Sequence, residues 1–288
     1  MDVATISLLA LLVTIVVSCT IRLHVGFLAI ALAWLVGLYA GIDANQVMAG
    51  FPTRLFLTLA GVTLLFSQAQ ANGTLDRIAR RAVLYCRGNA GVIPMMFFVL
   101  AFVLASIGPG NIAATAIIAP MAMAVAGQVR IPAFLVAIMV GNGANAGSLS
   151  PIAPTGIIVN GIMADVGLAG FEWHNYLNNM VAHTVIAFGA YFLLGGMKLI
   201  RRRHSEEIEV PGNPDTEAAN DWSFDRNHYV TMGVIFALIV GVIFFGINIG
   251  MGAFMGAILL SLFKVGDELK AVNLIPWRVI MMVCGVTV

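Results

Sequence analysis

The sequence predicts an all-α polytopic membrane protein with inverted repeats, a re-entrant hairpin and a broken helix. Three observations lead to this fold class. Hydrophobic residues make up 60% of the 288 residues and charged residues only 10%, whereas soluble domains carry roughly 25% charged residues. Long apolar runs follow one another, and two of them are interrupted by glycine, asparagine and proline. A short pattern also recurs near the end of the chain.

Six of the apolar runs predict membrane spans, because a transmembrane helix needs about 20 mostly apolar residues. Between them, residues 74–88 form an amphipathic stretch that we expect to lie at the membrane surface. Residues 201–227 are the only sizeable polar stretch and predict a solvated linker. The six expected spans lie near residues 3–21, 25–41, 54–71, 176–199, 229–246 and 249–264.

The two interrupted runs predict irregular membrane segments. Residues 91–126 are broken by the turn Gly-Pro-Gly-Asn at 108–111. Residues 131–163 are broken by the Gly- and Asn-rich segment 141–148, which two prolines follow. We expect the first run to be a re-entrant hairpin and the second to be a helix that is unwound in its middle.

The basic residues predict an orientation, because cytoplasmic loops collect Lys and Arg. If the N-terminus is outside and 91–126 enters and leaves on the cytoplasmic side, every Lys and Arg except Arg54 lies inside. If 91–126 crossed the membrane instead, the Arg cluster at 201–203 would lie outside. The charges therefore favour a hairpin that does not cross. We expect a multi-pass protein of a bacterial inner (cytoplasmic) membrane, with its N-terminus outside.

An internal repeat relates the two ends of the chain. Residues 51–63, FPTRLFLTLAGVT, and residues 275–287, IPWRVIMMVCGVT, share Pro, Arg, Gly, Val and Thr in register. Two apolar spans and a short polar helix precede each copy. The predicted orientation inverts the two copies, and inverted repeats are typical of secondary transporters.

The repeat also predicts the domain organisation. The second copy ends just inside its third helix, and about 13 apolar residues do not span a bilayer. We therefore expect a truncated second repeat, in a chain that lacks the last part of a carrier. The predicted domains are a first repeat at 1–203 with five spans and the hairpin 91–126, a cytoplasmic linker at 204–227, and the start of the second repeat at 228–288.

The two breaks are the predicted binding site. Half-helices that start after Asn111 and near Thr155 would present free N–H groups and positive dipole ends, which bind carboxylates. A half-helix that ends near Gly141 would present carbonyls suited to a cation. The alternative is that the breaks are kinks whose small residues let helices pack closely. Neutral amide and hydroxyl groups at the same depth come from Asn111, Thr115, Asn142, Asn145, Ser148, Ser150 and Thr155.

The ionisable residues bear on the coupling ion. No acidic residue lies well inside an expected span, whereas proton-driven carriers usually place a carboxylate or histidine in the pathway. His183 is a candidate proton relay, although a packed or interfacial histidine fits the sequence equally well. Neutral oxygen ligands favour sodium.

Two segments resemble known transporters. GNIAATAIIAP at 110–120 resembles the Ser-Asn-Thr hairpin signature of the divalent anion:sodium symporters and the wider ion-transporter superfamily. GNGANAGSLSPIAPTG at 141–156 resembles the unwound helix that follows it. With the start of the chain, SPIAPTGIIVNGI at 150–162 is most similar to the dicarboxylate carrier family that includes malonate carriers of Mat type. This resemblance extends over essentially all 288 residues.

The resemblance implies two inverted repeats, each with a re-entrant hairpin, often in a homodimer with an elevator-like movement. It implies uptake of di- or tricarboxylates with sodium or protons. Two departures are Gly110, where the signature has Ser, and Ile112, where it has Thr. The implied substrate-binding set comprises Asn111, Thr115, Asn142, Asn145, Ser148, Pro154 and Thr155, to which the polar Ser150 is added. The expected ion-binding set comprises Gly110, Asn111, Gly141 and Asn145.

The resulting hypothesis is a secondary active carrier for small organic dicarboxylates such as malonate or C4-dicarboxylates, coupled to a cation. Its expected partners are the small organic anion and the lipid bilayer, without nucleic acid. A transporter of another anion, or a sodium/proton antiporter of the same superfamily, would have the same fold. A membrane-embedded enzyme is the alternative from another class, but His183 is the only candidate base at depth.

Overall fold

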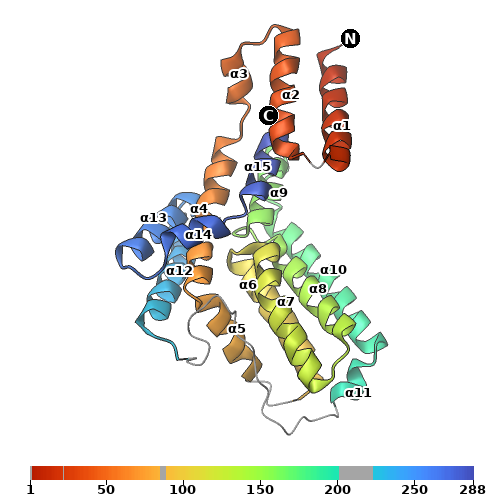
Figure 1. The fold of residues 1–288 in the computed structure, drawn as a ribbon, viewed down its shortest axis with the longest axis vertical. Coiled ribbons are helices and arrows are strands. Elements are labelled where there is room, and N and C mark those ends of the chain that lie inside the picture. The colour runs from red at the N-terminus through yellow and green to blue at the C-terminus, as the bar shows by residue number, and fades with distance from the viewer. Residues whose placement is uncertain (1, 22, 85–88, 201–222) are drawn as a thin grey trace. The chain divides into compact units, whose positions relative to one another are not determined.

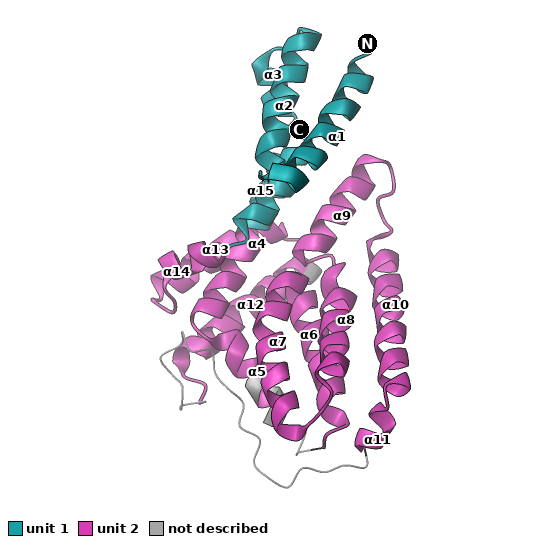
Figure 2. Cartoon of the chain, turned by 45° about the vertical axis from the view of Figure 1, so that its right-hand side comes forward, with its two compact units in different colours: residues 1–60, 275–288 teal, residues 61–274 magenta. Residues whose placement is uncertain are grey.

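The computed structural model describes residues 2–21, 23–84, 89–200 and 223–288, and over these residues the chain is α-helical with no β-strand. This confirms the predicted all-α class. The chain forms two compact units, residues 1–60 with 275–288 and residues 61–274 (Figure 2). The helices are α1 Val3–Ile21, α2 Val25–Ala40, α3 Ala44–Ala49, α4 Thr53–Ala71, α5 Thr74–Leu84, α6 Val92–Ile107, α7 Gly110–Val129, α8 Ala133–Ser148, α9 Pro154–Asp165, α10 Glu172–Leu193, α11 Gly196–Ile200, α12 Arg226–Phe245, α13 Ile249–Leu262, α14 Glu268–Leu274 and α15 Trp277–Val286 (Figure 1).

The six expected spans are all helical, as α1, α2, α4, α10, α12 and α13. Among the described residues, however, only α1 and α7 are both long and apolar enough to cross a membrane, and the bent pair α14 and α15 is a third if it counts as one span. The expected spans α2 and α13 are shorter apolar helices, and in α12 the apolar stretch counted is the shorter segment Arg226–Val242. Helix α10 is long enough, but Asn178, Asn179 and His183 lower its hydropathy. Of these, Asn179 and His183 contact α8.

In the first unit, α2 and α15 touch through backbone. A Cβ added to Gly285 of α15 would lie 2.3 Å from the Gly26 carbonyl oxygen of α2, so neither glycine tolerates a side chain without movement. His24, at the N-cap of α2, places its Nε2 2.9 Å from the carbonyl oxygen of Arg278. Small residues at the crossing thus let these two helices approach closely.

The second unit contains an equivalent crossing between α4 and α13. A Cβ on Gly61 of α4 would lie 2.4 Å from the Gly250 carbonyl oxygen of α13. Gly61 precedes Gly285 by 224 positions (285 − 61), and Gly26 precedes Gly250 by the same 224 (250 − 26). The third helix of each sequence copy therefore crosses the second helix of the other copy at matching glycines. This reciprocal contact supports the repeat, whose inversion stays a prediction.

The main core of the second unit is a bundle of α6, α7, α8 and α10 (Figure 1). Fully buried side chains from the first three helices fill it, among them Phe97, Ile118 and Met139. Helix α8 lies at the centre, in contact with each of the other three. Because α8 contains the Asn-rich segment, its position brings that segment against both the hairpin and α10.

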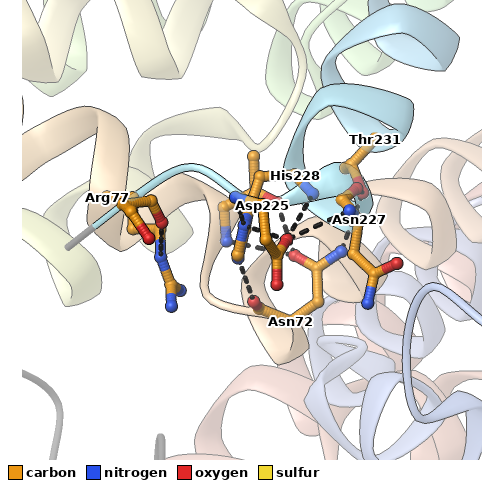
Figure 3. A network of polar contacts seen from close by, with 8 residues as sticks. Asn72, Arg77, Asp225, Asn227, His228 and Thr231 are labelled. Carbon is orange, nitrogen blue, oxygen red and sulfur yellow. Dashed lines mark hydrogen bonds and ion pairs between the residues drawn. The ribbon is translucent and has the colours of Figure 1, made fainter. Parts of the chain in front are cut away.

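A polar network fixes the start of α12 to the turn between α4 and α5 (Figure 3). His228 is buried, and its Nε2 lies 3.1 Å from the carbonyl oxygen of Asn72. The side-chain amide of Asn72 donates to the Thr231 hydroxyl at 2.8 Å. Asp225 caps α12 by accepting from the backbone N–H groups of Asn227 and His228. The network thereby connects helices that are distant in sequence.

Part of the predicted organisation lies outside the described residues. Residues 201–222, which hold the Arg cluster at 201–203 and most of the predicted linker 204–227, are outside them. Residues 223–225 precede α12, whose first two residues complete the predicted linker. The domain boundaries at 203 and 228 and the orientation of the hairpin stay predictions.

Candidate functional site

The segment predicted to be a hairpin forms two consecutive helices joined by a two-residue turn, and its re-entrant course in a membrane stays a prediction. Helix α6 ends at Ile107 and α7 begins at Gly110. Gly108 and Gly110 have φ values of 146° and 77°, which favour glycine. A Cβ on Gly108 would also lie 2.0 Å from the Phe66 ring. The glycines of this turn are thus explained by backbone conformation and by space.

The second break is shorter than predicted. Residues 141–148 are helical and belong to α8, so the expectation that this segment is unwound was wrong. Gly141 lies within the helix and cannot supply a carbonyl end for a cation. The break is confined to residues 149–153, and α9 begins at Pro154, one residue before the predicted start near Thr155. Pro154 occupies the first helical position, where its missing N–H does no harm.

The glycines of α8 explain why this segment stays helical. A Cβ on Gly143 would lie 2.4 Å from the Phe98 carbonyl oxygen, and one on Gly147 would lie 2.5 Å from that of Phe102. The two glycines are four residues apart and so share one face of the helix. That face packs directly on the backbone of α6, and this packing outweighs the low helix propensity of glycine. The alternative of close helix packing is correct for this segment.

The two breaks meet. A Cβ on Gly110, at the start of α7, would lie 3.1 Å from Cδ of Pro154, at the start of α9. The side-chain amide of Asn111 donates a hydrogen bond of 2.9 Å to Oδ1 of Asn145 on α8. Both asparagines are partly buried. The N-termini of α7 and α9 therefore converge beside a pair of amide side chains, so the positive ends of two helix dipoles face one region.

Helix α10 adds two polar side chains to this region. Nδ2 of Asn179 donates to the Asn145 carbonyl oxygen at 2.7 Å, and lies 3.3 Å from that of Ala146. One turn further along α10, Nδ1 of His183 lies 2.9 Å from Oδ1 of Asn142. Asn179 was not predicted from the sequence, although its four-residue spacing from Asn175 and His183 places the three residues on one face of α10.

The other predicted residues have more local roles. Ser148 is buried, and its hydroxyl donates to the Asn145 carbonyl oxygen at 2.7 Å, within its own helix. Ser150 is buried, and its Oγ lies 3.5 Å from the backbone nitrogen of Ile152 in the turn. Thr115, one turn after Asn111, and Thr155, in the first turn of α9, are partly buried, and no described residue hydrogen-bonds their hydroxyls. The serines therefore shape the break, whereas the threonines leave their hydroxyls available.

The region has no fixed charge in its middle. Helices α6, α7 and α8 carry no Asp, Glu, Lys or Arg, α9 carries only Asp165 as its last residue, and α10 carries only Glu172 in its first turn. No group of three or more His, Cys, Asp or Glu residues that could hold a metal ion occurs among the described residues. An anion here would meet helix N-termini, amides and one imidazole. Such an arrangement can bind a carboxylate without a permanent cation.

A comparison with models of protein families shows to which family the chain belongs. The model described as "Dicarboxylate carrier protein MatC N-terminus" matches residues 1–148, which is 148 of the 288 residues. The chain belongs to this family. The match confirms the resemblance to Mat-type dicarboxylate carriers. It includes the hairpin and all of α8, whereas Asn179 and His183 of α10 lie beyond it. No curated protein matches the chain.

Proposed function

We propose that this protein is a secondary active carrier that takes up small organic dicarboxylates, such as malonate or a C4-dicarboxylate, together with a cation. The observation that carries the proposal is the Asn111–Asn145 hydrogen bond of 2.9 Å beside the converging starts of α7 and α9. Membership of the dicarboxylate carrier family supports a transporter rather than an enzyme. The substrate would be an anion, and the starts of α7 and α9 would offer it the positive ends of two helix dipoles.

Dicarboxylates suit the site because they carry two charged ends at a short distance. In the proposed complex one carboxylate accepts from the first free N–H groups of α7 and the other from those of α9. The hydroxyls of Thr115 and Thr155 and the amide of Asn145 supply further donors. A monocarboxylate would engage only one helix end and should therefore bind more weakly.

The coupling cation would use neutral oxygens. Asn111 and Asn145 offer side-chain carbonyl oxygens next to the turn at Gly110. Oxygen ligands without a cluster of carboxylates are compatible with sodium. Gly141 is not part of this proposed cation site, because it lies inside α8, where no helix end leaves its carbonyl free.

The membrane arrangement is part of the same proposal. The carrier lies in a bacterial inner membrane with its N-terminus outside and α6 and α7 as a re-entrant hairpin. The two sequence copies are inverted, and two chains form a homodimer. The apolar helices and the reciprocal glycine crossings support a membrane protein built from a repeat.

Uptake into liposomes tests the proposal. Purified protein is reconstituted, and the entry of labelled malonate, succinate and citrate is followed with and without an inward sodium gradient. We expect saturable malonate or succinate uptake that the gradient stimulates, with labelled acetate as the monocarboxylate control. An absence of uptake of every di- and tricarboxylate, under both a sodium and a proton gradient, would overturn the proposal.

A further inference from the structure

The hydrogen bonds of Asn142 determine which nitrogen of His183 carries hydrogen. Nδ2 of Asn142 donates to the Ile138 carbonyl oxygen at 3.0 Å, which directs the amide oxygen towards His183. Nδ1 of His183 lies 2.9 Å from that oxygen. An amide oxygen only accepts hydrogen bonds, so Nδ1 must donate. In the neutral ring the lone pair, and with it the ability to accept a proton, therefore lies on Nε2.

His183 is the only histidine, acid or base in the middle of α10 and of the helices that pack on it, over the described residues. Helices α6 and α8 contribute none. Asp165 is the last residue of α9, and Lys198 lies in α11. The remaining ionisable groups on α10 are Glu172 and His174 in its first turn, Tyr176 and Tyr191.

A dianion in this neutral region would favour protonation of His183. Burying two negative charges without a compensating positive charge is unfavourable, and histidine is the side chain that changes charge near neutral pH. A proton from water that binds the Nε2 lone pair turns the ring into an imidazolium with hydrogen on both nitrogens. Nδ1 keeps its bond to Asn142, while Nε2–H can donate a charge-assisted hydrogen bond to a carboxylate.

We propose that His183 takes up one proton when a dicarboxylate binds and returns it to water when the dicarboxylate leaves, so that His183 couples carrier loading to protons. The inference rests on the proposed function and adds a proton to its coupling cation. Binding and protonation are linked reciprocally: if the imidazolium binds the anion more tightly, the bound anion must favour the imidazolium. The affinity is therefore highest when His183 is protonated and falls as pH rises.

The test measures protons and ligand together. Purified protein in a weakly buffered solution with a pH indicator is titrated with malonate, and bound malonate is measured in parallel. Near pH 7.5 we expect net uptake of up to one proton per bound malonate. The affinity should fall by up to about tenfold for each further pH unit.

Two substitutions separate titration from structure. His183→Asn keeps an amide N–H near the position of Nδ1, facing Asn142, but cannot be protonated. His183→Gln places its amide near the position of Nε2. Both should bind malonate more weakly, release or take up no proton, and show a flat pH profile. His174→Asn is the matched control, because His174 is an exposed histidine on the same helix, and it should behave as the wild type.

The outcomes distinguish the inference from the function on which it rests. Malonate binding without proton uptake by the wild type overturns the role of His183 and leaves the carrier intact. The same holds if His183→Asn and His183→Gln take up as many protons as the wild type. If both variants fail to fold, judged by their thermal unfolding, the wild-type proton count decides alone. If the wild type binds no dicarboxylate, the proposed function fails and the inference fails with it.

Discussion

The amide of Asn111 donates to Oδ1 of Asn145 at 2.9 Å and thereby connects the start of α7 to the last turn of α8. If this pair belongs to the dicarboxylate site, each alanine substitution should weaken malonate binding by about tenfold or more, which corresponds to one lost hydrogen bond to a charged ligand. The double variant should lose less binding free energy than the sum of the two single losses, because the two side chains hydrogen-bond to one another. Binding isotherms measure this. Asn178→Ala, an exposed asparagine on α10, is the control.

The helical path of α8 gives a second prediction, from two glycines two positions apart. A Cβ on Gly143 would meet the Phe98 carbonyl oxygen at 2.4 Å, whereas a Cβ on Gly141 would meet nothing within 4 Å. Gly143→Ala should lower stability by about 1–3 kcal/mol through overpacking. Gly141→Ala should be neutral or stabilise by up to about 1 kcal/mol, since alanine favours helix. Thermal unfolding compares them. Equal destabilisation by the two substitutions, or loss of malonate binding only in Gly141→Ala, would contradict the helical path of residues 141–148 and favour an unwound segment.

The reciprocal crossings predict matched effects in the two units. Gly61→Val and Gly285→Val each insert a branched side chain where a backbone carbonyl lies within 2.4 Å of the new Cβ. Both should lower the unfolding temperature and the yield of folded protein by similar amounts. Gly233→Val on α12 is the control, because open space surrounds that position. If only one of the two crossings is sensitive, the repeat copies are not packed equivalently.

The network at the start of α12 predicts a stability effect away from the site. Thr231→Val removes the acceptor of the Asn72 amide while keeping the shape of the side chain. Because Thr231 is fully buried, we expect a loss of about 1–2 kcal/mol from the unpaired amide. Malonate affinity should not change. Thr20→Val is the control, since that exposed hydroxyl bonds only within its own helix. Equal unfolding temperatures for the two variants would argue against the network.

Helix positions could be predicted from this sequence, and the path of α8 could not. The apolar runs locate the helices because burial or membrane insertion of such runs leaves backbone hydrogen bonding within the helix as the main option. Glycine and asparagine in α8 have low intrinsic helix propensity, so local reasoning predicts unwinding. The structure keeps the helix because Gly143 and Gly147 contact α6, and that contact comes from residues more than forty positions away.

The site was predictable in part for a similar reason. Asn111, Asn145 and Pro154 were identified because they stand in or next to the breaks predicted from the sequence, and the structure brings them together. Asn179 stands in an otherwise helical span, where a single amide carries no local signal. Only its alignment with His183 on one face of α10, combined with the packing of α10 on α8, shows that it belongs to the cluster.

The most direct test of the central claim locates the dicarboxylate at the meeting point of α7 and α9. A cysteine is introduced as Thr155→Cys, in a background where the three native cysteines are replaced by serine, and its reaction with a water-soluble maleimide is timed with and without malonate. Asn178→Cys serves as the exposed control. We predict that saturating malonate slows the labelling of Thr155→Cys several-fold, that acetate does not, and that Asn178→Cys is unaffected. Unchanged labelling of Thr155→Cys by a protein that binds malonate would contradict the account.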